Sequence, residues 1–273
     1  MSTRGQRYAS LLAGLALLTT TAAAPNPNAS EPTTVTQTAD KCEPPHKPVP
    51  QLIKNLAPGV NAAEPNLGFK KLELAYFKCS RAYDRRLDEV VQQAQHYIES
   101  RLRSARTTDR LAIVLDIDET ALSNWPELEA SDFGFTVGDN CTLGPNRGCA
   151  FDAWIKLAQA KAITPTLALF RFALEQHIAV FFVTARREAD QRADTIKNLT
   201  DEHYVGWTAL YMCGPGVCGP DNKLVQKFKA EQRAKIEAQG FQIIANIGDQ
   251  FSDLAGAHAD RAFKLPNPFY FIP

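Results

Sequence analysis

The sequence lacks a net charge. Its 273 residues contain 30 Lys and Arg against 30 Asp and Glu, so the formal net charge at pH 7 is zero. A chain without an excess of either sign has no global field that would attract nucleic acid or a charged membrane surface. We therefore expect no nucleic-acid polymer among its partners.

The N-terminal region lacks an apolar run long enough for a comfortable membrane span. Residues 9–18 form a short apolar segment that follows Arg4 and Arg7 and precedes the small residues 22–24. This is the pattern of a secretory signal peptide. We expect residues 1–24 to be removed on export to the periplasm or the cell exterior, with no stable membrane insertion afterwards. An uncleaved N-terminal anchor is the alternative.

None of the six cysteines forms a Cys-x-x-Cys pair. An even number of cysteines in an exported chain favours disulfides. The predicted disulfides are Cys141–Cys149, Cys213–Cys218 and Cys42–Cys79. A four-cysteine zinc site is the alternative, but the close spacing typical of such sites is missing.

The chain has no internal repeat, and its composition is that of an ordinary globular protein, with 45% hydrophobic and 22% charged residues. Residues 25–50 are rich in Pro, Thr, Asn and Ala without hydrophobic periodicity, which predicts a flexible lead-in. Residues 51–273 are enough for one large domain with short appendages.

The apolar run at residues 111–115 leads directly into two carboxylates, Asp116 and Asp118. An uninterrupted run of Leu, Ile and Val predicts a strand buried on both faces of a parallel sheet. Ligands bind at the carboxyl ends of such strands, so Asp116 is expected at a site. Residues i and i+2 share a face of an extended chain, and two crowded carboxylates indicate a cation or a phosphoryl group between them.

Two further apolar runs also end in polar residues. One leads to Thr184 and Arg186, and the other leads to Asp249 and Asp253. The two aspartates are four residues apart, so they would face the same side at the start of a helix. Either could instead be an ordinary helix cap. Three strand ends thus carry groups suited to phosphate and metal.

Helical patterns alternate with the apolar runs. This alternation predicts an α/β fold with a parallel sheet flanked by helices. The predicted strands span residues 111–115, 179–184, 207–212, 243–248 and 261–265, and the predicted helices span residues 165–177, 187–199, 223–240 and 253–259. Upstream, an apolar spacing near 3.6 predicts one or two N-terminal helices within residues 66–106. The long connection at 123–164 predicts a structured insertion, with a loop at 132–148 and a short helix at 151–158.

In this order, the motifs resemble those of the haloacid dehalogenase superfamily of phosphatases. The closer resemblance is to secreted acid phosphatases, the class B enzymes and the relatives of plant vegetative storage proteins, and it covers residues 111–272. The segments that carry it are Asp116–Thr120, Asn198-Leu199, Phe228-Lys229, Gly248–Leu254 and Phe263–Pro268. The resemblance implies a Rossmann-like parallel sheet over residues 107–273, with a small cap insertion at about 123–164 above the active site.

The resemblance also implies a Mg²⁺-dependent acid phosphatase that acts through an aspartyl-phosphate. Asp116 would be the nucleophile, and Asp118 would be the general acid and then the general base. Thr184 would donate hydrogen bonds to the phosphoryl oxygens, and Lys229 would pair with Asp116 and the phosphate. Lys227 or Lys223 could instead be the family's lysine.

The implied magnesium ligands are a carboxylate oxygen of Asp116, the backbone carbonyl of Asp118, and Asp249, with Asp253 as a direct or supporting ligand. An oxygen-rich set of this kind suits Mg²⁺. Arg186 would orient the phosphate or a neighbouring carboxylate. Trp154 is a candidate for an aromatic substrate wall, which would be compatible with nucleoside monophosphates among other esters.

Other functions are possible on the same fold. Some relatives are storage or binding proteins that have lost the nucleophile, and the presence of Asp116 favours an active enzyme. Dehalogenases lack the second aspartate, so Asp118 argues against that reaction. The export signal argues against a phosphomutase, whose sugar phosphates are cytosolic. The oligomeric state has no signature in the sequence.

Overall fold

The computed structural model describes residues 67–136, 138, 141–144, 147–218 and 222–272. The predicted signal peptide at 1–24, the lead-in at 25–50 and Cys42 lie outside the described residues. So does the choice between a cleaved signal and an anchor.

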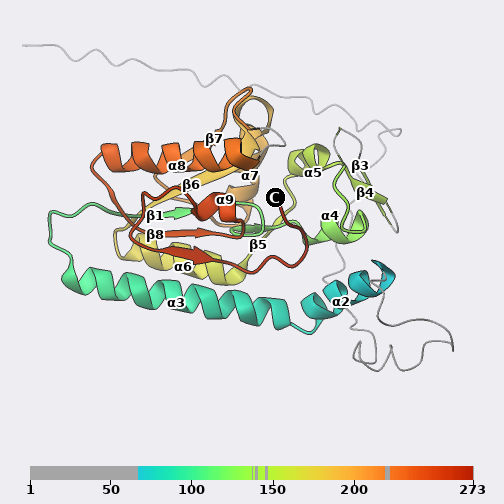
Figure 1. Ribbon diagram of the computed structural model, residues 1–273, viewed down its shortest axis with the longest axis horizontal. Helices are drawn as coiled ribbons and strands as arrows, with labels where there is room; N and C mark the ends of the chain where they lie inside the picture. The colour runs from blue at the N-terminus through green and yellow to red at the C-terminus, as the bar shows by residue number, and fades with distance from the viewer. Residues whose placement is uncertain (1–66, 137, 139–140, 145–146, 219–221, 273) are drawn as a thin grey trace, which may run out of the picture. The chain divides into compact units, whose positions relative to one another are not determined.

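A five-stranded parallel sheet lies at the centre of the fold (Figure 1). Its strands are β1 (Leu111–Leu115), β6 (Ala179–Arg187), β7 (Ala209–Cys213), β8 (Gln242–Gly248) and β9 (Ala262–Lys264), in the spatial order β7-β6-β1-β8-β9. The chain first builds the sheet on one side of β1 and then returns to build the other side. The point where the direction reverses lies between β1 and β8, and this is where ligands bind in sheets of this kind. The predicted α/β fold is therefore confirmed.

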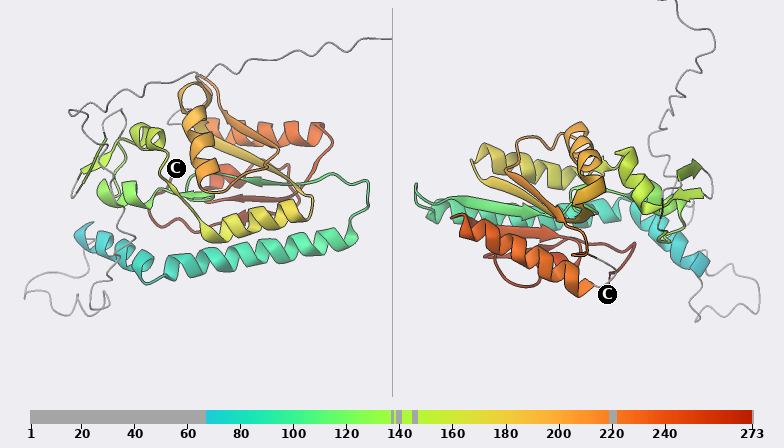
Figure 2. Two further views of the ribbon diagram at one scale, coloured as in Figure 1. Left: turned by 180° about the vertical axis from the view of Figure 1, so that it is seen from behind. Right: turned by 90° about the horizontal axis from the view of Figure 1, so that it is seen from above.

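Helices cover both faces of this sheet (Figure 2). They are α3 (Ala82–Ser104), α6 (Thr164–Glu175), α7 (Glu188–Asp201) and α8 (Asn222–Ala238). Side chains alternate along a strand, so each strand serves two cores. On β1, Ile113 and Leu115 belong to the larger core, which includes residues of α3 and α6. Val114 belongs to the smaller core, which includes Phe228 and Ile236 of α8.

The N-terminal region predicted as helical contains two helices, α2 (Leu67–Cys79) and α3. They are separated at Arg81, whose backbone adopts a left-handed conformation with φ 59°. The apolar stripe of α3 is buried, including Tyr83, Leu87 and Ile98. This helix therefore packs on the domain, as its periodicity indicates.

The insertion after β1 has its own small framework. β2 (Leu122–Ser123) and β5 (Lys161–Ala162) pair antiparallel at its base, and α4 (Trp125–Ala130) and α5 (Phe151–Leu157) lie between them in sequence. The prediction of a loop over 132–148 was wrong for its second half, because β3 (Cys141–Gly144) and β4 (Arg147–Cys149) form an antiparallel ribbon there. Gly- and Asn-rich composition hid this ribbon, in which Cys141 faces Cys149.

Both predicted local disulfides, Cys141–Cys149 and Cys213–Cys218, are present. The first joins the two strands of the ribbon. The second closes the loop after β7, and Cys213 packs in the smaller core with Phe228. The predicted pair Cys42–Cys79 includes a residue outside the described part of the chain. None of the described helices is long and apolar enough to cross a membrane.

The larger core allows a direct test of this packing. Phe182 is fully buried and its ring contacts those of Phe170, Tyr204 and Trp207. We expect Phe182→Ala to lower the free energy of unfolding by about 3–5 kcal/mol, because it leaves a cavity that the neighbours cannot fill. Urea denaturation measures this change.

The matched control is Phe271→Ala, a phenylalanine that is 69% exposed. Its expected effect on the free energy of unfolding is below about 0.5 kcal/mol. Equal losses in the two variants would contradict the placement of Phe182 in the core.

Candidate active site

The carboxyl ends of three strands bring the predicted polar residues together at one edge of the sheet. Asp116 follows β1, Thr184 lies in β6, and Asp249 follows β8. All three side chains are buried. β6 extends three residues beyond its predicted end, so Arg186 is part of the strand.

Lys229 lies at the centre of this group. Its Nζ atom is 2.6 Å from Oδ1 of Asp116 and 2.6 Å from Oδ1 of Asp253. Burial alone would lower the pKa of Lys229, but the two carboxylates outweigh burial and raise it. The ammonium group therefore stays charged. Of the alternative lysines, Lys227 is 74% exposed at its side chain and pairs with Glu231 on the surface of α8.

Asp249 is held by donors from three segments. Its carboxylate accepts hydrogen bonds from Thr120 (3.3 Å), Gln250 (2.5 Å) and Asn267 (2.7 Å). The Lys264 ammonium donates to the backbone carbonyl of the same residue. Asn267 belongs to the Pro-Asn-Pro segment that contributes to the family resemblance, and its contact explains why that segment accompanies the motif.

Asp253 serves the site and a helix end at once. Short helix α9 spans Phe251–Leu254, so it begins two residues earlier and ends five residues earlier than the predicted helix at 253–259. Gln250 and Asp253 form a capping box, in which the Gln250 backbone N–H donates to Asp253 Oδ2 at 2.8 Å. The other oxygen of Asp253 accepts from Lys229. The capping role and the site role, which the sequence presented as alternatives, therefore coexist.

The acidic cluster is short of positive charge. The ligand atoms of Asp116, Asp249 and Asp253 all lie within 4.8 Å of one another. Burial raises the pKa of Asp116 well above its usual value, and Asp253 and Asp249 add to this rise against the pull of Lys229. Burial and Asp253 likewise raise the pKa of Asp249 to about 7. Buried carboxylates at this separation are stabilised by a cation, and their oxygens are the donor set of a hard divalent metal.

Asp118 has a different environment from its neighbour. The Arg186 guanidinium donates two hydrogen bonds to the Asp118 carboxylate, from Nη2 to Oδ1 at 2.7 Å and from Nε to Oδ2 at 3.1 Å. Asn124 donates a further hydrogen bond at 3.0 Å. Burial would raise the pKa of Asp118, but Arg186 and then Asn124 lower it below the usual value. The two aspartates of the first motif thus have pKa values shifted in opposite directions, as is common for residues with different catalytic roles.

Thr184 and Arg186 are linked through the backbone. The Thr184 hydroxyl accepts a hydrogen bond from the Arg186 backbone N–H at 3.2 Å. A hydroxyl that accepts in this way keeps its own hydrogen free to donate to a ligand. The Arg186 guanidinium also donates to Thr195 of α7 at 3.2 Å, which fixes the direction of the arginine.

Trp154, predicted as a substrate contact, lies in the interior instead. It is 1% exposed, and its indole N–H donates to the side-chain oxygen of Asn124 at 2.8 Å. Among the contacts of the described residues, Trp154 is linked to the site through Asn124. Glu119 is also buried at the site without having been predicted there. Its partners are Tyr83 of α3 and Asn124, the residue before α4, and nothing in the local sequence around Glu119 identifies them.

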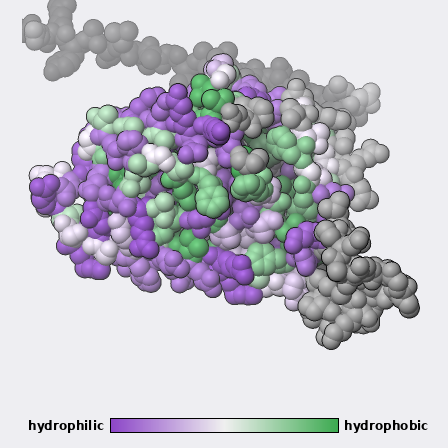
Figure 3. All heavy atoms as spheres, in the orientation of Figure 1, coloured by the Kyte–Doolittle hydropathy of each residue, from purple (hydrophilic) through white to green (hydrophobic). Residues whose placement is uncertain are grey.

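Apolar side chains gather near the middle of the face shown in Figure 3, where Figure 1 draws α9 and the C-terminal segment. The large exposed apolar residues of these two segments are Phe251, Phe271 and Ile272. The Ile272 backbone N–H donates to the side chain of Gln250 at 3.2 Å, next to Asp249. An apolar surface thus adjoins the acidic cluster.

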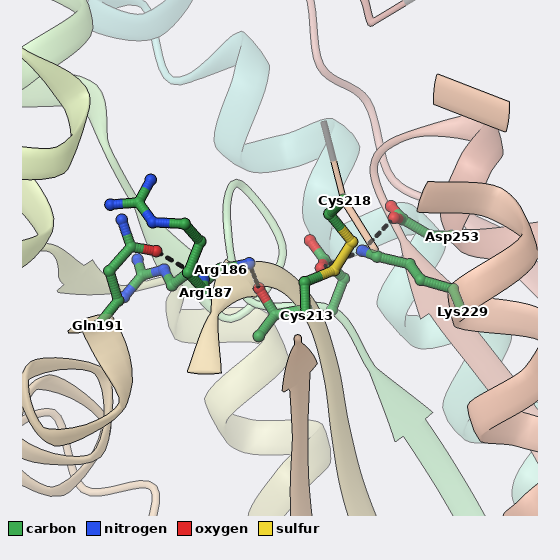
Figure 4. The surroundings of a disulfide bond; sticks show 9 residues. Arg186, Arg187, Gln191, Cys213, Cys218, Lys229 and Asp253 are labelled. Carbon is green, nitrogen blue, oxygen red and sulfur yellow. Dashed lines mark hydrogen bonds and ion pairs between the residues drawn. A yellow bond between two sulfur atoms is a disulfide. The ribbon is translucent and has the colours of Figure 1, made fainter. Parts of the chain in front are cut away.

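The Cys213–Cys218 disulfide borders the site from the β7 side. In Figure 4 it lies between the Arg186 side chain and the Lys229–Asp253 pair. Arg187 pairs with Cys213 in the strand register, and its guanidinium turns away to Asp152 and Asp190. Arg187 therefore connects the site's edge to α5 of the insertion.

The model of the HAD superfamily, subfamily IIIB (acid phosphatase), matches residues 70–273. Among curated proteins, acid phosphatase 1 of Solanum lycopersicum is 33% identical over 191 residues, which are 70% of this chain and 69% of that protein. The stem 28 kDa glycoprotein of Glycine max is 32% identical over 185 residues, 67% of each chain. Vegetative storage protein 1 of Arabidopsis thaliana is 30% identical over 162 residues, 59% of this chain and 55% of that protein.

Among solved structures, the class C acid phosphatase from Bacillus anthracis shares the fold, with a TM-score of 0.57 at 20% sequence identity. The likeness covers 75% of this chain and 85% of that one. The family match spans the sheet, the insertion and the whole acidic cluster. The chain therefore belongs to the acid phosphatases of haloacid dehalogenase subfamily IIIB and is a phosphoric monoester hydrolase.

Proposed function

We propose that this chain is a Mg²⁺-dependent acid phosphatase that hydrolyses small phosphate monoesters through an aspartyl-phosphate on Asp116. The observation that carries the proposal is the position of Lys229, 2.6 Å from both Asp116 and Asp253. A carboxylate nucleophile beside a fixed positive charge can approach an anionic phosphate, which a bare carboxylate would repel. The other carboxylates of the cluster then serve the metal.

In the first step, an Asp116 oxygen attacks phosphorus in line with the leaving group. The new O–P bond forms as the ester P–O bond breaks, and Asp118 gives its proton to the departing alkoxide. In the second step, Asp118 takes a proton from water, which attacks phosphorus and breaks the bond to Asp116. Lys229 and the free hydrogen of the Thr184 hydroxyl stabilise the phosphoryl oxygens in both steps.

The environment of Asp118 sets the pH at which the first step works. Burial would raise the pKa of Asp118, but Arg186 and Asn124 lower it below the usual value, so this group becomes protonated only at acidic pH. A general acid must be protonated before it can act. The lowered pKa of Asp118 therefore predicts an acidic working range. The anionic form of Asp118, which dominates at higher pH, suits the base role of the second step.

Asp116, Asp249 and Asp253, with the Asp118 carbonyl, are the residues that would hold Mg²⁺. When bound, the metal supplies charge that screens the nucleophile from the substrate and polarises a phosphoryl oxygen. The raised pKa of Asp249, caused by burial and Asp253, supports a site built for a cation.

We infer that the enzyme is exported and acts on phosphate esters outside the cytoplasm. The signal-peptide pattern at residues 1–24 and the two disulfides support this location. The exposed apolar residues Phe251 and Phe271 beside the site favour esters with an apolar or aromatic leaving group, nucleoside monophosphates among them. A storage role with weak catalysis is the second candidate, and the vegetative storage proteins among the relatives are the reason to keep it.

Replacing the nucleophile tests the reaction. We expect Asp116→Asn to lower kcat for phosphate release by at least about a thousandfold, because the amide cannot form the acyl phosphate. The side chain keeps its shape, so far-UV circular dichroism should be unchanged. Phosphate release from a panel of monoesters, in Mg²⁺ and in EDTA, is the measurement.

The matched control is Asp260→Asn, which removes an aspartate just before β9, at the amino end of a sheet strand and paired with Arg101. It should retain full activity. Substantial turnover by Asp116→Asn would rule out Asp116 as the nucleophile, and no turnover by the folded wild type in Mg²⁺ would favour the storage role.

Metal binding should also be visible without any substrate. Mg²⁺ binds only the folded site, so at about 100 times its dissociation constant it should add about 2.7 kcal/mol to the free energy of unfolding. We expect thermal melts to show this gain in the wild type and to lose it in Asp249→Asn. In that variant Thr120 can donate or accept toward the new amide, so the fold without metal should be retained.

Asp260→Asn again serves as the control and should keep the full Mg²⁺ effect. An Asp249→Asn variant that melts with the same Mg²⁺ dependence as the wild type would show that Asp249 is not a ligand.

A further inference from the structure

Asp118 has a second fixed partner besides Arg186. The Asn124 side-chain amide donates to Oδ1 of Asp118 at 3.0 Å. Asn124 is fully buried and lies directly before α4, so it comes from a different element than Arg186 on β6. Two donors from two elements restrain both the position and the plane of one carboxylate, which neither could do alone.

Trp154 determines which end of the Asn124 amide faces Asp118. An indole N–H can only donate, and it lies 2.8 Å from the amide oxygen of Asn124. The oxygen is therefore committed to Trp154, and the NH₂ group is left to face the carboxylate. If the amide were reversed, its oxygen would face an anion and Trp154 would lose its acceptor. A tryptophan of the insertion thus sets the polarity of a group that touches Asp118.

The backbone of Asn124 is held separately by Glu119. One Glu119 oxygen accepts from the Asn124 backbone N–H at 2.5 Å, and the other accepts from the Tyr83 hydroxyl of α3 at 3.3 Å. Glu119 is fully buried and adopts a left-handed backbone with φ 52°, which is uncommon for a residue with a side chain. Such conformations persist where surrounding contacts hold them, and they gather at functional sites.

We propose that Asn124 is a positioning residue for Asp118 and that Trp154 sets its orientation, so that the insertion contributes to proton transfer without touching substrate. This inference rests on the proposed role of Asp118 as general acid. Proton transfer requires the acid to be held within hydrogen-bond reach of the leaving oxygen. Without the Asn124 donor, the Asp118 carboxylate is still held by Arg186, but its proton is no longer placed accurately toward the leaving oxygen.

A general acid matters most when the leaving group is a poor one. A primary alkoxide needs a proton to depart, whereas p-nitrophenolate leaves without one. The diagnostic quantity is the ratio of kcat/KM for an alkyl phosphate to kcat/KM for p-nitrophenyl phosphate. The fraction of folded enzyme cancels in this ratio, so a variant that folds poorly still gives a valid answer. A purely structural role would lower both values equally and leave the ratio unchanged.

The experiment compares Asp118→Asn, Asn124→Ala and Trp154→Phe in the full chain with Mg²⁺. We expect the ratio to fall by about a hundredfold or more in Asp118→Asn, which lacks the acid. It should fall by about tenfold in Asn124→Ala and about threefold in Trp154→Phe, because the acid remains but is held less firmly. Trp154→Phe keeps a six-membered aromatic ring at this position and removes the five-membered ring of the indole with its N–H.

The matched control is Trp125→Phe, which makes the same change in the residue after Asn124, where the ring packs against Phe133 and Phe269. Its ratio should equal that of the wild type. An unchanged ratio in Asn124→Ala and Trp154→Phe, with a reduced ratio in Asp118→Asn, would overturn the inference and leave the proposed function intact. An unchanged ratio in Asp118→Asn would overturn the general-acid role and the inference with it. A fall in Trp125→Phe as large as that in Trp154→Phe would also overturn it.

Discussion

The ammonium group of Lys229, held between Asp116 and Asp253, is the interaction on which the site depends. Three buried carboxylates meet at the ends of β1 and β8, and their mutual repulsion would push these ends apart. One internal positive charge, 2.6 Å from two of them, makes the arrangement tolerable. It offsets only part of the negative charge, and the remaining negative charge favours the binding of a divalent cation.

Helix α8 supplies more than this one charge. One turn beyond Lys229, the Arg233 guanidinium donates to the backbone carbonyls of Asp253, Ala255 and Ala257. The same helix therefore holds the side chain of Asp253 with Lys229 and its backbone with Arg233. The residue before Lys229, Phe228, packs in the smaller core and anchors the same turn of the helix. The position of the Lys229 charge is thus a consequence of how one helix packs on the sheet.

Much of this could be predicted from sequence because it is local. The runs that form β1, β6 and β8 are continuous and apolar, and the polar residues that follow them must lie at one edge of a parallel sheet. The ribbon at β3 and β4 was missed because the surrounding segment at 132–148 is rich in Gly and Asn, which favour turns, and pairing across the ribbon overrides this preference. The extension of β6 to Arg187 was missed because charged residues seldom continue a buried strand.

The remaining errors concern contacts between distant segments. As an aromatic residue of the insertion, Trp154 was predicted to line the substrate pocket. Its indole N–H instead donates to Asn124, 30 residues away in the sequence, inside the protein. The Tyr83 hydroxyl donates a hydrogen bond to Glu119, which is 36 residues away in the sequence. Tyr83 lies on α3, a helix whose apolar pattern indicates only packing. No local pattern encodes such a meeting, because it depends on how α3 and the insertion dock on the sheet. The insertion and the N-terminal helix therefore belong to the environment of Asp118, a role that their sequences do not reveal.

The central claim is that Asp116 carries the phosphoryl group during turnover. The most direct test is to quench the enzyme in acid while it turns over a phosphate monoester in Mg²⁺, digest it, and locate any phosphate by mass spectrometry. The account predicts a phosphate on Asp116, within the peptide that spans β1, which disappears when substrate is exhausted and is missing in Asp116→Asn. Steady turnover with no phosphate on Asp116 in rapidly quenched samples, or with phosphate on a different residue, would contradict it.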